Sequence, residues 1–388
     1  MKRERKRKMD FRRLTEFLDE LPGWRIPGVD MMVAVDGETV YRHQAGWRDR
    51  EKGIPMTGDE LYWIYSASKV ITCAAALTLY EQGRYLLSDP VSEYIPEAKH
   101  LAVRRVRPDG QTVVEPAREA LTIRHLFTMT SGLDYDLGRP EIAEAVQATG
   151  GRAPTVEVAK AILKRPLMFE PGSHFLYSLS HDVLAAVMEV IAGMPFRDYV
   201  KQAVFDPCGM RDSGYHMTDE KLARMAQQYR FDDAKGIAEP IGPVNAYIFG
   251  PEYDSGGAGM VTSVEDYMKF ARMMTRLGVT DGGERILSPG TVNLMRTNHL
   301  CPAQQKDFDW PQFIGYGYGL GVRTMTDRSL SGSAGPVGEF GWGGAAGAYV
   351  LIDPDNRVTA YYAQHMLNNQ EPYVHPRLRN LLYACLEL

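Results

Sequence analysis

Apolar residues near both ends of the chain form short runs that are joined by tight turns. Residues 31–35 and 39–43 flank Asp36-Gly37, a dipeptide that adopts the positive φ angles of a two-residue hairpin turn. Residues 348–352 and 358–363 flank Pro354-Asp355-Asn356 in the same way. The two patterns predict antiparallel β-hairpins, one from each end of the chain.

The middle of the chain has a helical period instead. Segment 69–82 is apolar on nearly all sides, so it predicts a helix that is buried inside the protein. Apolar residues also recur three or four positions apart in four other stretches, which are residues 157–165, 181–192, 196–204 and 264–277.

These elements predict an α/β (α+β) fold in which an antiparallel sheet from both chain ends is flanked by helices. A mostly helical domain is inserted between the two ends. We expect residues 14–62 and 240–388 to form the sheet-containing domain and residues 63–239 the helical domain. Small-molecule sites favour domain boundaries, so we expect the active site in the cleft between them.

The composition is that of a soluble globular protein, with 44% hydrophobic residues, 24% charged residues and a net charge of -5 over 388 residues. Residues 1–13 form a basic arm that we expect to be disordered, and the remainder of the chain is correspondingly more acidic. A broad nucleic-acid or membrane surface is therefore not expected. No secretory signal follows the arm, and the most apolar stretch, residues 70–80, is roughly half as long as a bilayer span. We expect a cytoplasmic protein.

Metal and redox chemistry are not expected. The four cysteines lie far apart and form no C-x-x-C pair, and the nine histidines show no metal-ligand spacing. We therefore expect no metal and no cofactor, and we expect most histidines at the surface or at helix caps. The stretch Asp254-Ser255-Gly256-Gly257 is interpreted as a turn. The segment Gly341-x-Gly343-x-x-Ala346 is not a dinucleotide site, because a strand rather than a helix follows it.

The strongest candidate for chemistry is Ser66-Ala67-Ser68-Lys69, at the start of the most apolar helix. One helical turn separates Ser66 from Lys69, so the amine can reach the hydroxyl. A lysine buried there would lose proton affinity and could act as a base, while the helix N-terminus favours a developing alkoxide. The alternative is an N-cap serine followed by a lysine that reaches solvent, and the tetrad alone favours that alternative.

Two further segments strengthen the catalytic interpretation. Tyr177 ends a loop just before the helix that starts near Ser180, where a tyrosine could move a proton between nucleophile and leaving group. Its alternative is an ordinary packing aromatic. The small residues of Gly341-Trp342-Gly343-Gly344-Ala345 would let the N–H of Ala345, with that of Ser66, form an oxyanion hole. The alternative for this segment is a β-bulge at a sheet edge.

With these segments in this order, the sequence resembles the serine β-lactamase-like, penicillin-recognising superfamily, with its S-x-x-K, Y-x-N and K-T-G elements. The resemblance extends from about Gly28 to Ala363 and includes residues 121–133, which are similar to the family's T-I-R-H-L-L-x-H-T-S-G-L segment, residues 256–263 with Asp266, and residues 315–321. It implies the β-lactamase/transpeptidase-like fold.

Departures from the superfamily pattern are most similar to the family VIII carboxylesterases, which resemble class C β-lactamases. Leu179 stands in place of the asparagine of Y-x-N, and Trp342-Gly343-Gly344 stands in place of K-T-G. We expect Leu179 and Trp342 to offer an apolar surface that suits short acyl esters. His181 could approach the site, although we expect it at the surface.

The resemblance implies a role for each site residue. Ser66 is the nucleophile and Lys69 and Tyr177 are its proton-transfer partners; the predicted oxyanion hole is Ser66 with Ala345, and the predicted substrate pocket is Trp342, Gly343, Gly344 and Tyr135. Whether Lys69 or Tyr177 is the principal base is left open.

The function implied is a serine carboxylesterase that hydrolyses short-chain esters through an acyl-enzyme on Ser66. One set of alternatives keeps the site and changes the reaction to that of a β-lactamase, a D-amino-acid peptidase or an acyltransferase. Another is a non-catalytic penicillin sensor or structural assembly protein. The partner expected is a small-molecule ester or amide; the natural ester, the acyl length and a homo-oligomeric state are left open.

Overall fold

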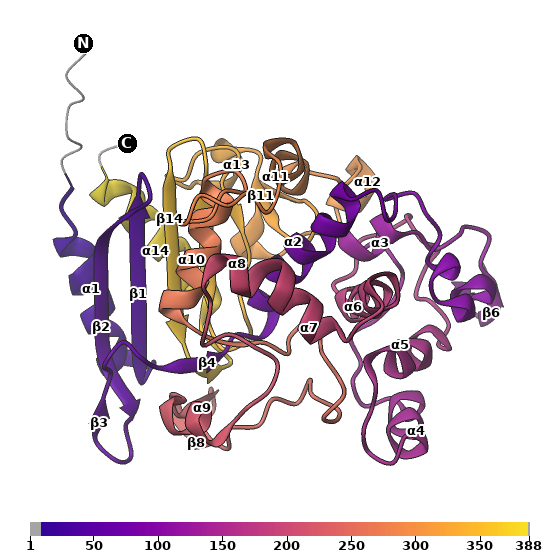
Figure 1. Cartoon of the computed structure of the whole chain (residues 1–388), viewed down its shortest axis with the longest axis horizontal. Coiled ribbons are helices and arrows are strands. Elements are labelled where there is room, and N and C mark those ends of the chain that lie inside the picture. The colour runs from indigo at the N-terminus through magenta and orange to yellow at the C-terminus, as the bar shows by residue number, and fades with distance from the viewer. Residues whose placement is uncertain (1–8, 387–388) are drawn as a thin grey trace, which may run out of the picture.

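An eight-stranded antiparallel sheet joins the two ends of the chain, as the hairpin patterns predict. The computed structural model describes residues 9–386, and Figure 1 shows the sheet beside a group of helices. In spatial order the strands are β10 (Tyr316–Tyr318), β11 (Arg323–Met325), β12 (Phe340–Gly341), β13 (Tyr349–Asp353), β14 (Val358–Gln364), β1 (Gly28–Val35), β2 (Glu38–Asp49) and β3 (Ile54–Pro55).

Both predicted hairpins are confirmed, as β1–β2 and β13–β14. Asp36 and Gly37 have φ angles of 54° and 87°, which are the positive values that the turn requires. β1 also pairs with β14 in an antiparallel register that places Val29 opposite Gln364. The N-terminal and C-terminal hairpins are therefore neighbours at the centre of the sheet.

Helices cover both faces of this sheet. Met31, Val33 and Val35 pack in a core with α1 (Arg12–Trp24) and α14 (Glu371–Cys385). Met32 and Ala34 belong to the larger core that contains α2 (Ser68–Glu81) and α10 (Val264–Thr275). Because successive side chains of a strand point to opposite faces, a strand with helices on both sides is apolar at nearly every position. The mixed α/β fold class predicted from the sequence is thus confirmed.

The helical stretches predicted from the sequence are confirmed, and segment 196–204 continues from helix α7 into a π-helical turn at Lys201–Phe205. In the predicted buried helix α2 every residue from Ser68 to Leu79 is buried. Between the sheet-covering helices α1 and α14 the α-helices are α2 (Ser68–Glu81), α3 (Ile123–Phe127), α4 (Pro140–Ala148), α5 (Thr155–Leu163), α6 (Ser180–Ala192), α7 (Phe196–Val200), α8 (Asp206–Cys208), α9 (Asp219–Arg224), α10 (Val264–Thr275), α11 (Pro289–Arg296), α12 (Pro302–Gln305) and α13 (Arg328–Ser331).

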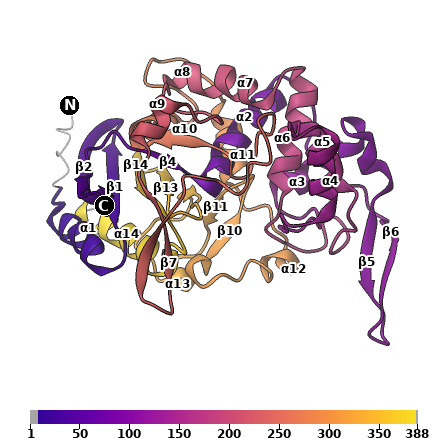
Figure 2. The same cartoon turned by 90° about the horizontal axis from the view of Figure 1, so that it is seen from below.

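Figures 1 and 2 place α3 to α6 and the β5–β6 hairpin at the end of the molecule opposite α1. Three smaller sheets complete the fold. They are β5 (Ala102–Val106) with β6 (Thr112–Pro116), β4 (Leu61–Trp63) with β9 (Val261–Ser263), and β15 (Met366–Leu367) with β7 (Gln228–Asp232) and β8 (Ile237–Ile241).

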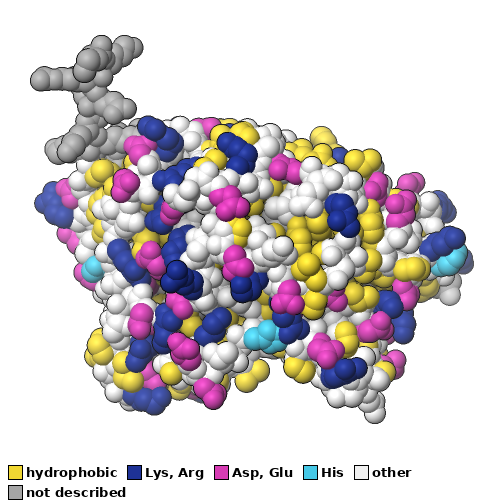
Figure 3. Space-filling view, in the orientation of Figure 1, with side chains coloured by type: hydrophobic (Ala, Val, Ile, Leu, Met, Phe, Trp, Pro, Cys, Tyr) yellow, Lys and Arg dark blue, Asp and Glu magenta, His cyan; other side chains and the backbone are white. Residues whose placement is uncertain are grey.

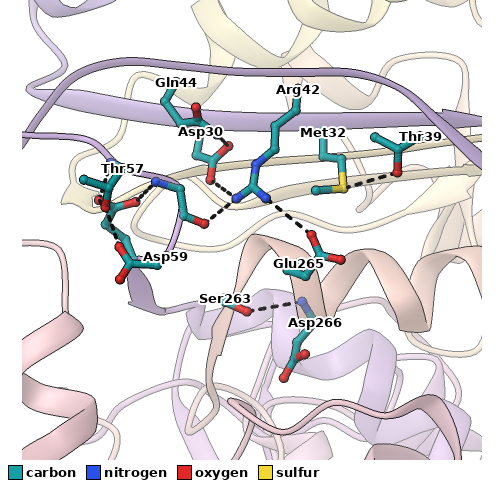
Figure 4. A network of polar contacts seen from close by, with 12 residues as sticks. Asp30, Met32, Thr39, Arg42, Gln44, Thr57, Asp59, Ser263, Glu265 and Asp266 are labelled. Atoms are coloured by element: carbon teal, nitrogen blue, oxygen red, sulfur yellow. Dashed lines mark hydrogen bonds and ion pairs between the residues drawn. The ribbon is translucent and has the colours of Figure 1, made fainter.

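A polar network fixes the loop that leads towards Ser66 (Figure 4). Arg42 of β2 donates hydrogen bonds to Asp30 of β1 at 3.0 Å, to Glu265 of α10 at 3.3 Å, and to the carbonyl oxygen of Gly58. Asp30 is almost fully buried, so its charge is paired where water cannot reach it. The contact with Gly58 ties the sheet to the loop just before β4, and β4 leads directly to Ser66.

The face of the molecule in Figure 3 carries Lys and Arg side chains interspersed with Asp and Glu. None of the helices in the described part of the chain is both long and apolar enough to cross a membrane. Of the predicted basic arm, residues 1–8 lie outside the described residues. The disorder expected for residues 1–13 is wrong for Arg12 and Arg13, because these two residues begin α1.

Candidate active site

Ser66 lies at the junction between β4 and α2. The short 3₁₀ turn Tyr65–Ala67 joins the two elements, and Tyr65 has a φ angle of 47°, which is in the left-handed region that side chains rarely adopt. Packing holds this conformation, because the buried Tyr65 donates a hydrogen bond to Gln228 at 3.2 Å and contacts the Tyr247 ring edge-on. The sharp turn leaves Ser66 half-buried at the start of the helix.

Lys69 lies fully buried beneath Ser66. Its Nζ donates hydrogen bonds to the carbonyl oxygen of Gly257 at 2.8 Å, to the Tyr135 hydroxyl at 3.1 Å and to Ser66 Oγ at 3.4 Å. Burial lowers the pKa of Lys69 to about 7, while the negative charge of Asp182 acts in the opposite direction. Both the ammonium and the free amine are therefore populated near neutral pH, and the free amine can accept a proton from Ser66.

Tyr177 lies within a stack of three aromatic rings. Tyr135 stacks against it at 5.4 Å between centroids and Trp342 at 5.5 Å, and Lys69 Nζ lies 4.6 Å from the Tyr177 centroid. Burial raises the pKa of Tyr177, although hydrogen bonds with Ser66 and Trp342 act in the opposite direction. At neutral pH the side chain is thus a phenol, which can donate a proton.

The turn after β12 packs directly against the chain that precedes Ser66. A Cβ atom on Gly344 would lie 2.1 Å from the carbonyl oxygen of Ile64, so only glycine fits this contact. The turn is closed by hydrogen bonds from the Gly344 N–H to the Ala348 oxygen at 2.8 Å and from the Gly347 N–H to the Gly344 oxygen at 2.7 Å. The structure therefore brings Ser66 and Ala345 to the same cavity.

The cavity in front of Ser66 has a volume of ≈ 670 Å³. All of the predicted pocket residues line it. Aromatic side chains are the most numerous kind in its lining, and three acidic residues but no lysine or arginine border it among the described residues. The aromatic members are Tyr135, Phe175, Tyr177, Tyr247, Trp310, Phe313 and Trp342, and the acidic ones are Asp307, Asp309 and Glu371.

Two sequence interpretations near the site need correction. His181 is fully buried rather than at the surface: its ring contacts Cys73 Sγ at 3.6 Å, and burial lowers its pKa to about 3. The histidine is on the first turn of α6, and that turn faces α2 instead of solvent. Leu179 does not line the cavity, because its side chain is 1% exposed and packs in the main core.

The sequence interpretation missed Asp182 and the role of the turn at residues 254–259. That stretch is a turn, as predicted, but it also supplies the Gly257 carbonyl to Lys69 and the Ser255 hydroxyl to Asp182 at 2.6 Å. The sequence contains a feature that could have identified Asp182, because this residue is the acid in the first turn of the mostly apolar helix that follows Tyr177. Within residues 9–386, no group of three or more His, Cys, Asp and Glu side chains could hold a metal ion.

Comparisons with known proteins place the chain among relatives of similar length. A family model described as Beta-lactamase matches residues 14–384. Protein Rv1367c of Mycobacterium tuberculosis (strain ATCC 25618 / H37Rv) is 34% identical over 350 residues, which are 88% of this chain and 86% of that protein. Esterase EstB of Burkholderia gladioli is 30% identical over 350 residues, 85% of this chain and 83% of its own.

A solved structure is also similar over nearly the whole chain. It is described as EstCE1, a hydrolase with promiscuous acyltransferase activity, and it superposes with a TM-score of 0.76 at 27% sequence identity. The superposition covers 96% of this chain and 97% of that one.

Proposed function

The chain belongs to the beta-lactamase family, and from this premise we propose that it is a serine carboxylesterase of the family VIII type, which hydrolyses short-chain esters through an acyl-enzyme on Ser66. One observation carries the proposal. The Ser66 hydroxyl lies 3.4 Å from a buried amine whose pKa is lowered to about 7, at the start of a helix and facing a cavity. This is the arrangement that activates a serine at neutral pH.

In the proposed mechanism the free amine of Lys69 takes the proton of Ser66 as Oγ attacks the ester carbonyl. The N–H groups of Ser66 and Ala345 hold the oxyanion. Tyr177, a phenol at neutral pH, gives its proton to the departing alkoxide, and the proton on Lys69 then neutralises the tyrosinate. Water attacks the acyl-enzyme by the same route, which restores the serine. The lowered pKa of Lys69 and the raised pKa of Tyr177 favour Lys69 as the base.

The charges around the cavity favour an ester without a carboxylate over a β-lactam. Asp307, Asp309 and Glu371 border the cavity and would repel the carboxylate that penicillins carry. Glu371 is ionised at neutral pH: burial acts to raise its pKa, but the nearby side chains of His375, 3.7 Å from its carboxylate, and Gln312 lower it overall. Trp342 occupies the place of the K-T-G lysine, so no cation stands there to offset these charges.

Residues from both predicted domains line the cavity, which supports the proposed division into a sheet-containing and a helical domain. Tyr135 and Tyr177 belong to residues 63–239, whereas Trp310, Trp342 and Glu371 belong to residues 240–388. The lining of the cleft thus comes from distant parts of the chain, as expected for a site at a domain boundary.

Acyl transfer is the second candidate, because the similar structure EstCE1 is described as having promiscuous acyltransferase activity. An alcohol would then replace water as the acceptor of the acyl group. Hydrolysis of p-nitrophenyl butyrate in the presence of added butanol tests this, because an acyltransferase produces butyl butyrate in addition to butyrate. If butyrate were the sole acyl product, the result would support hydrolysis and contradict acyl transfer.

The decisive experiment compares Ser66→Ala with Ser68→Ala. Ser68 is also a serine at the start of α2, but it is buried and accepts a hydrogen bond from the Met260 N–H at 3.2 Å. Ser66→Ala should lower turnover of p-nitrophenyl butyrate by about 10⁴-fold or more, and Ser68→Ala should retain most of it. Intact-protein mass spectrometry of the wild type during turnover should detect a butyryl adduct that Ser66→Ala lacks. Undiminished turnover by Ser66→Ala would overturn the proposal.

A further inference from the structure

Asp182 is a buried carboxylate with one oxygen left without a partner. Its side chain is 2% exposed, and Oδ1 accepts hydrogen bonds from the Tyr253 hydroxyl at 2.8 Å and from Ser255 Oγ at 2.6 Å. Oδ2 is buried and has no hydrogen-bond partner among the described residues. A buried carboxylate oxygen without a partner is costly, so its position requires an explanation.

The unpartnered oxygen faces Lys69 across Gly257. A Cβ atom on Gly257 would lie 2.6 Å from Asp182 Oδ2 and 3.2 Å from Lys69 Nζ, so one glycine separates the carboxylate from the amine. The separation of Asp182 Oδ2 and Lys69 Nζ is therefore within about 4–6 Å. Over that range an opposite charge favours the charged form of a titratable group. Any larger residue at position 257 would occupy the space between the two groups.

The other titratable groups around Lys69 are neutral at neutral pH. On α2 itself, burial raises the pKa of Cys73; on α6, burial lowers the pKa of His181 to about 3. The loop residues Tyr135 and Tyr177 have pKa values raised by burial. Asp182 also faces the buried phenols Tyr215 and Tyr253 and the half-buried phenol Tyr247, whose pKa values are raised as well. Asp182 is thus the one anion that faces Lys69 among the described residues.

We propose that Asp182 is a positioning residue that acts through Lys69, as the buried counter-charge that holds the amine between Ser66 and Gly257 and strengthens its affinity for the serine proton. The catalytic consequence rests on the proposed function. Burial alone disfavours the ammonium that forms when Lys69 takes this proton. A fixed carboxylate nearby stabilises that ammonium in a medium where water cannot, and so it supports the attack step.

The test is a direct titration of Lys69, which does not depend on ester turnover. The protein is labelled with ¹³C-lysine, and the ¹³Cε signal of Lys69 is assigned by its loss in Lys69→Ala. Its chemical shift is then followed from pH 5 to 10 in the wild type, Asp182→Asn and Asp182→Glu. Asp254→Asn is the matched control, because Asp254 is also buried and lies on the turn that carries Gly257, but it pairs with Arg197 at 2.9 Å.

We expect the Lys69 midpoint to fall by about one pH unit in Asp182→Asn, to remain close to that of the wild type in Asp182→Glu, and to be unchanged in Asp254→Asn. The acid limb of kcat/KM should move in the same direction. An unchanged midpoint in Asp182→Asn, or an equal shift in Asp254→Asn, would overturn the proposal, even if Asp182→Asn melts at a lower temperature. Should Asp182→Asn fail to fold, Asp182→Ser provides a smaller neutral replacement with the same expected shift.

Failure of the esterase proposal would be recognised separately. If Ser66→Ala retained turnover, the titration would still decide whether Asp182 sets the proton affinity of Lys69. If the titration showed no shift while Ser66→Ala was inactive, the esterase proposal would stand and the role of Asp182 would be only structural.

Discussion

The indole Nε1–H of Trp342 donates a hydrogen bond of 3.1 Å to the hydroxyl oxygen of Tyr177, and the two rings stack with their centroids 5.5 Å apart. Tyr135 also stacks against the ring of Tyr177, with the centroids 5.4 Å apart. Stacking therefore fixes the orientation of the Tyr177 ring, and the hydrogen bond fixes the position of its hydroxyl group. A proton donor that must meet a leaving group gains from such fixation, because little reorganisation is then needed in the transition state.

Trp342→Phe should impair this fixation while keeping an aromatic ring in the pocket. A neutral hydrogen bond contributes about 0.5–1.5 kcal/mol, so we expect kcat for p-nitrophenyl butyrate to fall by up to about tenfold. Trp310→Phe is the control, because Trp310 packs edge-on against the same tyrosine at 5.5 Å, and no hydrogen bond joins the two among the described contacts. An equal decrease in kcat in both variants would show that packing, and not the hydrogen bond, causes the effect.

The rate should depend on pH through Lys69. The pKa of Lys69 is lowered to about 7, and the amine accepts a proton only in its free form, so kcat/KM should fall about tenfold for each pH unit below that value. Above it the profile should level off, because the raised pKa of Tyr177 keeps the phenol protonated. The measurement is kcat/KM for p-nitrophenyl butyrate from pH 5 to 9.

Lys69→Arg provides the complementary control for this profile. A guanidinium keeps its charge throughout the range, so it cannot act as the base, and activity should fall by about 10²- to 10⁴-fold with no acid limb near pH 7. A wild-type profile that is flat between pH 6 and 8 would contradict the assignment of Lys69 as the base.

Gly344→Ala should disturb the proposed oxyanion hole without changing the proposed nucleophile, Ser66. The added Cβ would meet the Ile64 carbonyl oxygen, so the turn that carries Ala345 must move away from Ser66. Loss of one oxyanion donor costs about 10²- to 10³-fold in kcat, and we expect a decrease of that order. Gly242→Ala is the control, because a Cβ atom there meets nothing within 4 Å. Circular dichroism should show that both variants are folded, and wild-type kcat in Gly344→Ala would contradict the prediction.

The parts of the fold that the sequence could predict rest on local chemistry. Asp36-Gly37 favours a hairpin by the φ angles it allows, and segment 69–82, which is apolar on nearly all sides, predicts a helix with neighbours around it. Ser66 and Lys69 belong to the same helical turn, so their proximity also follows from the spacing. The resemblance to a known family supplied the positions of Tyr177 and Trp342.

The parts that the sequence could not predict depend on contacts between distant segments. The carbonyl that holds Lys69 comes from Gly257, 188 residues further along the chain, and no periodicity encodes such a pairing. The prediction that His181 lies at the surface was wrong for the same reason. A histidine in the first turn of a helix is expected to be exposed unless the helix that packs over it is known. Asp182 was missed because the direction of its carboxylate and the groups that it faces depend on how the core is packed.

The acidic border of the cavity should make the enzyme discriminate by substrate charge. p-Nitrophenyl butyrate and mono-p-nitrophenyl succinate share the leaving group and a four-carbon acyl chain, but the second ends in a carboxylate. Asp307, Asp309 and Glu371 border the cavity, so the anionic ester should be the poorer substrate, by about tenfold or more in kcat/KM.

Replacing Glu371 by Gln removes one of these charges and should narrow the difference between the two esters by raising kcat/KM for the succinate alone. Added salt should reduce the difference in kcat/KM between the two esters further, because it screens the charge of the exposed Asp309. Ions screen charges at the surface more than those in the cavity. Equal rates for the two esters in the wild type would show that the border does not select by charge. The preference for esters over β-lactams would then have to come from the shape of the Trp342 wall.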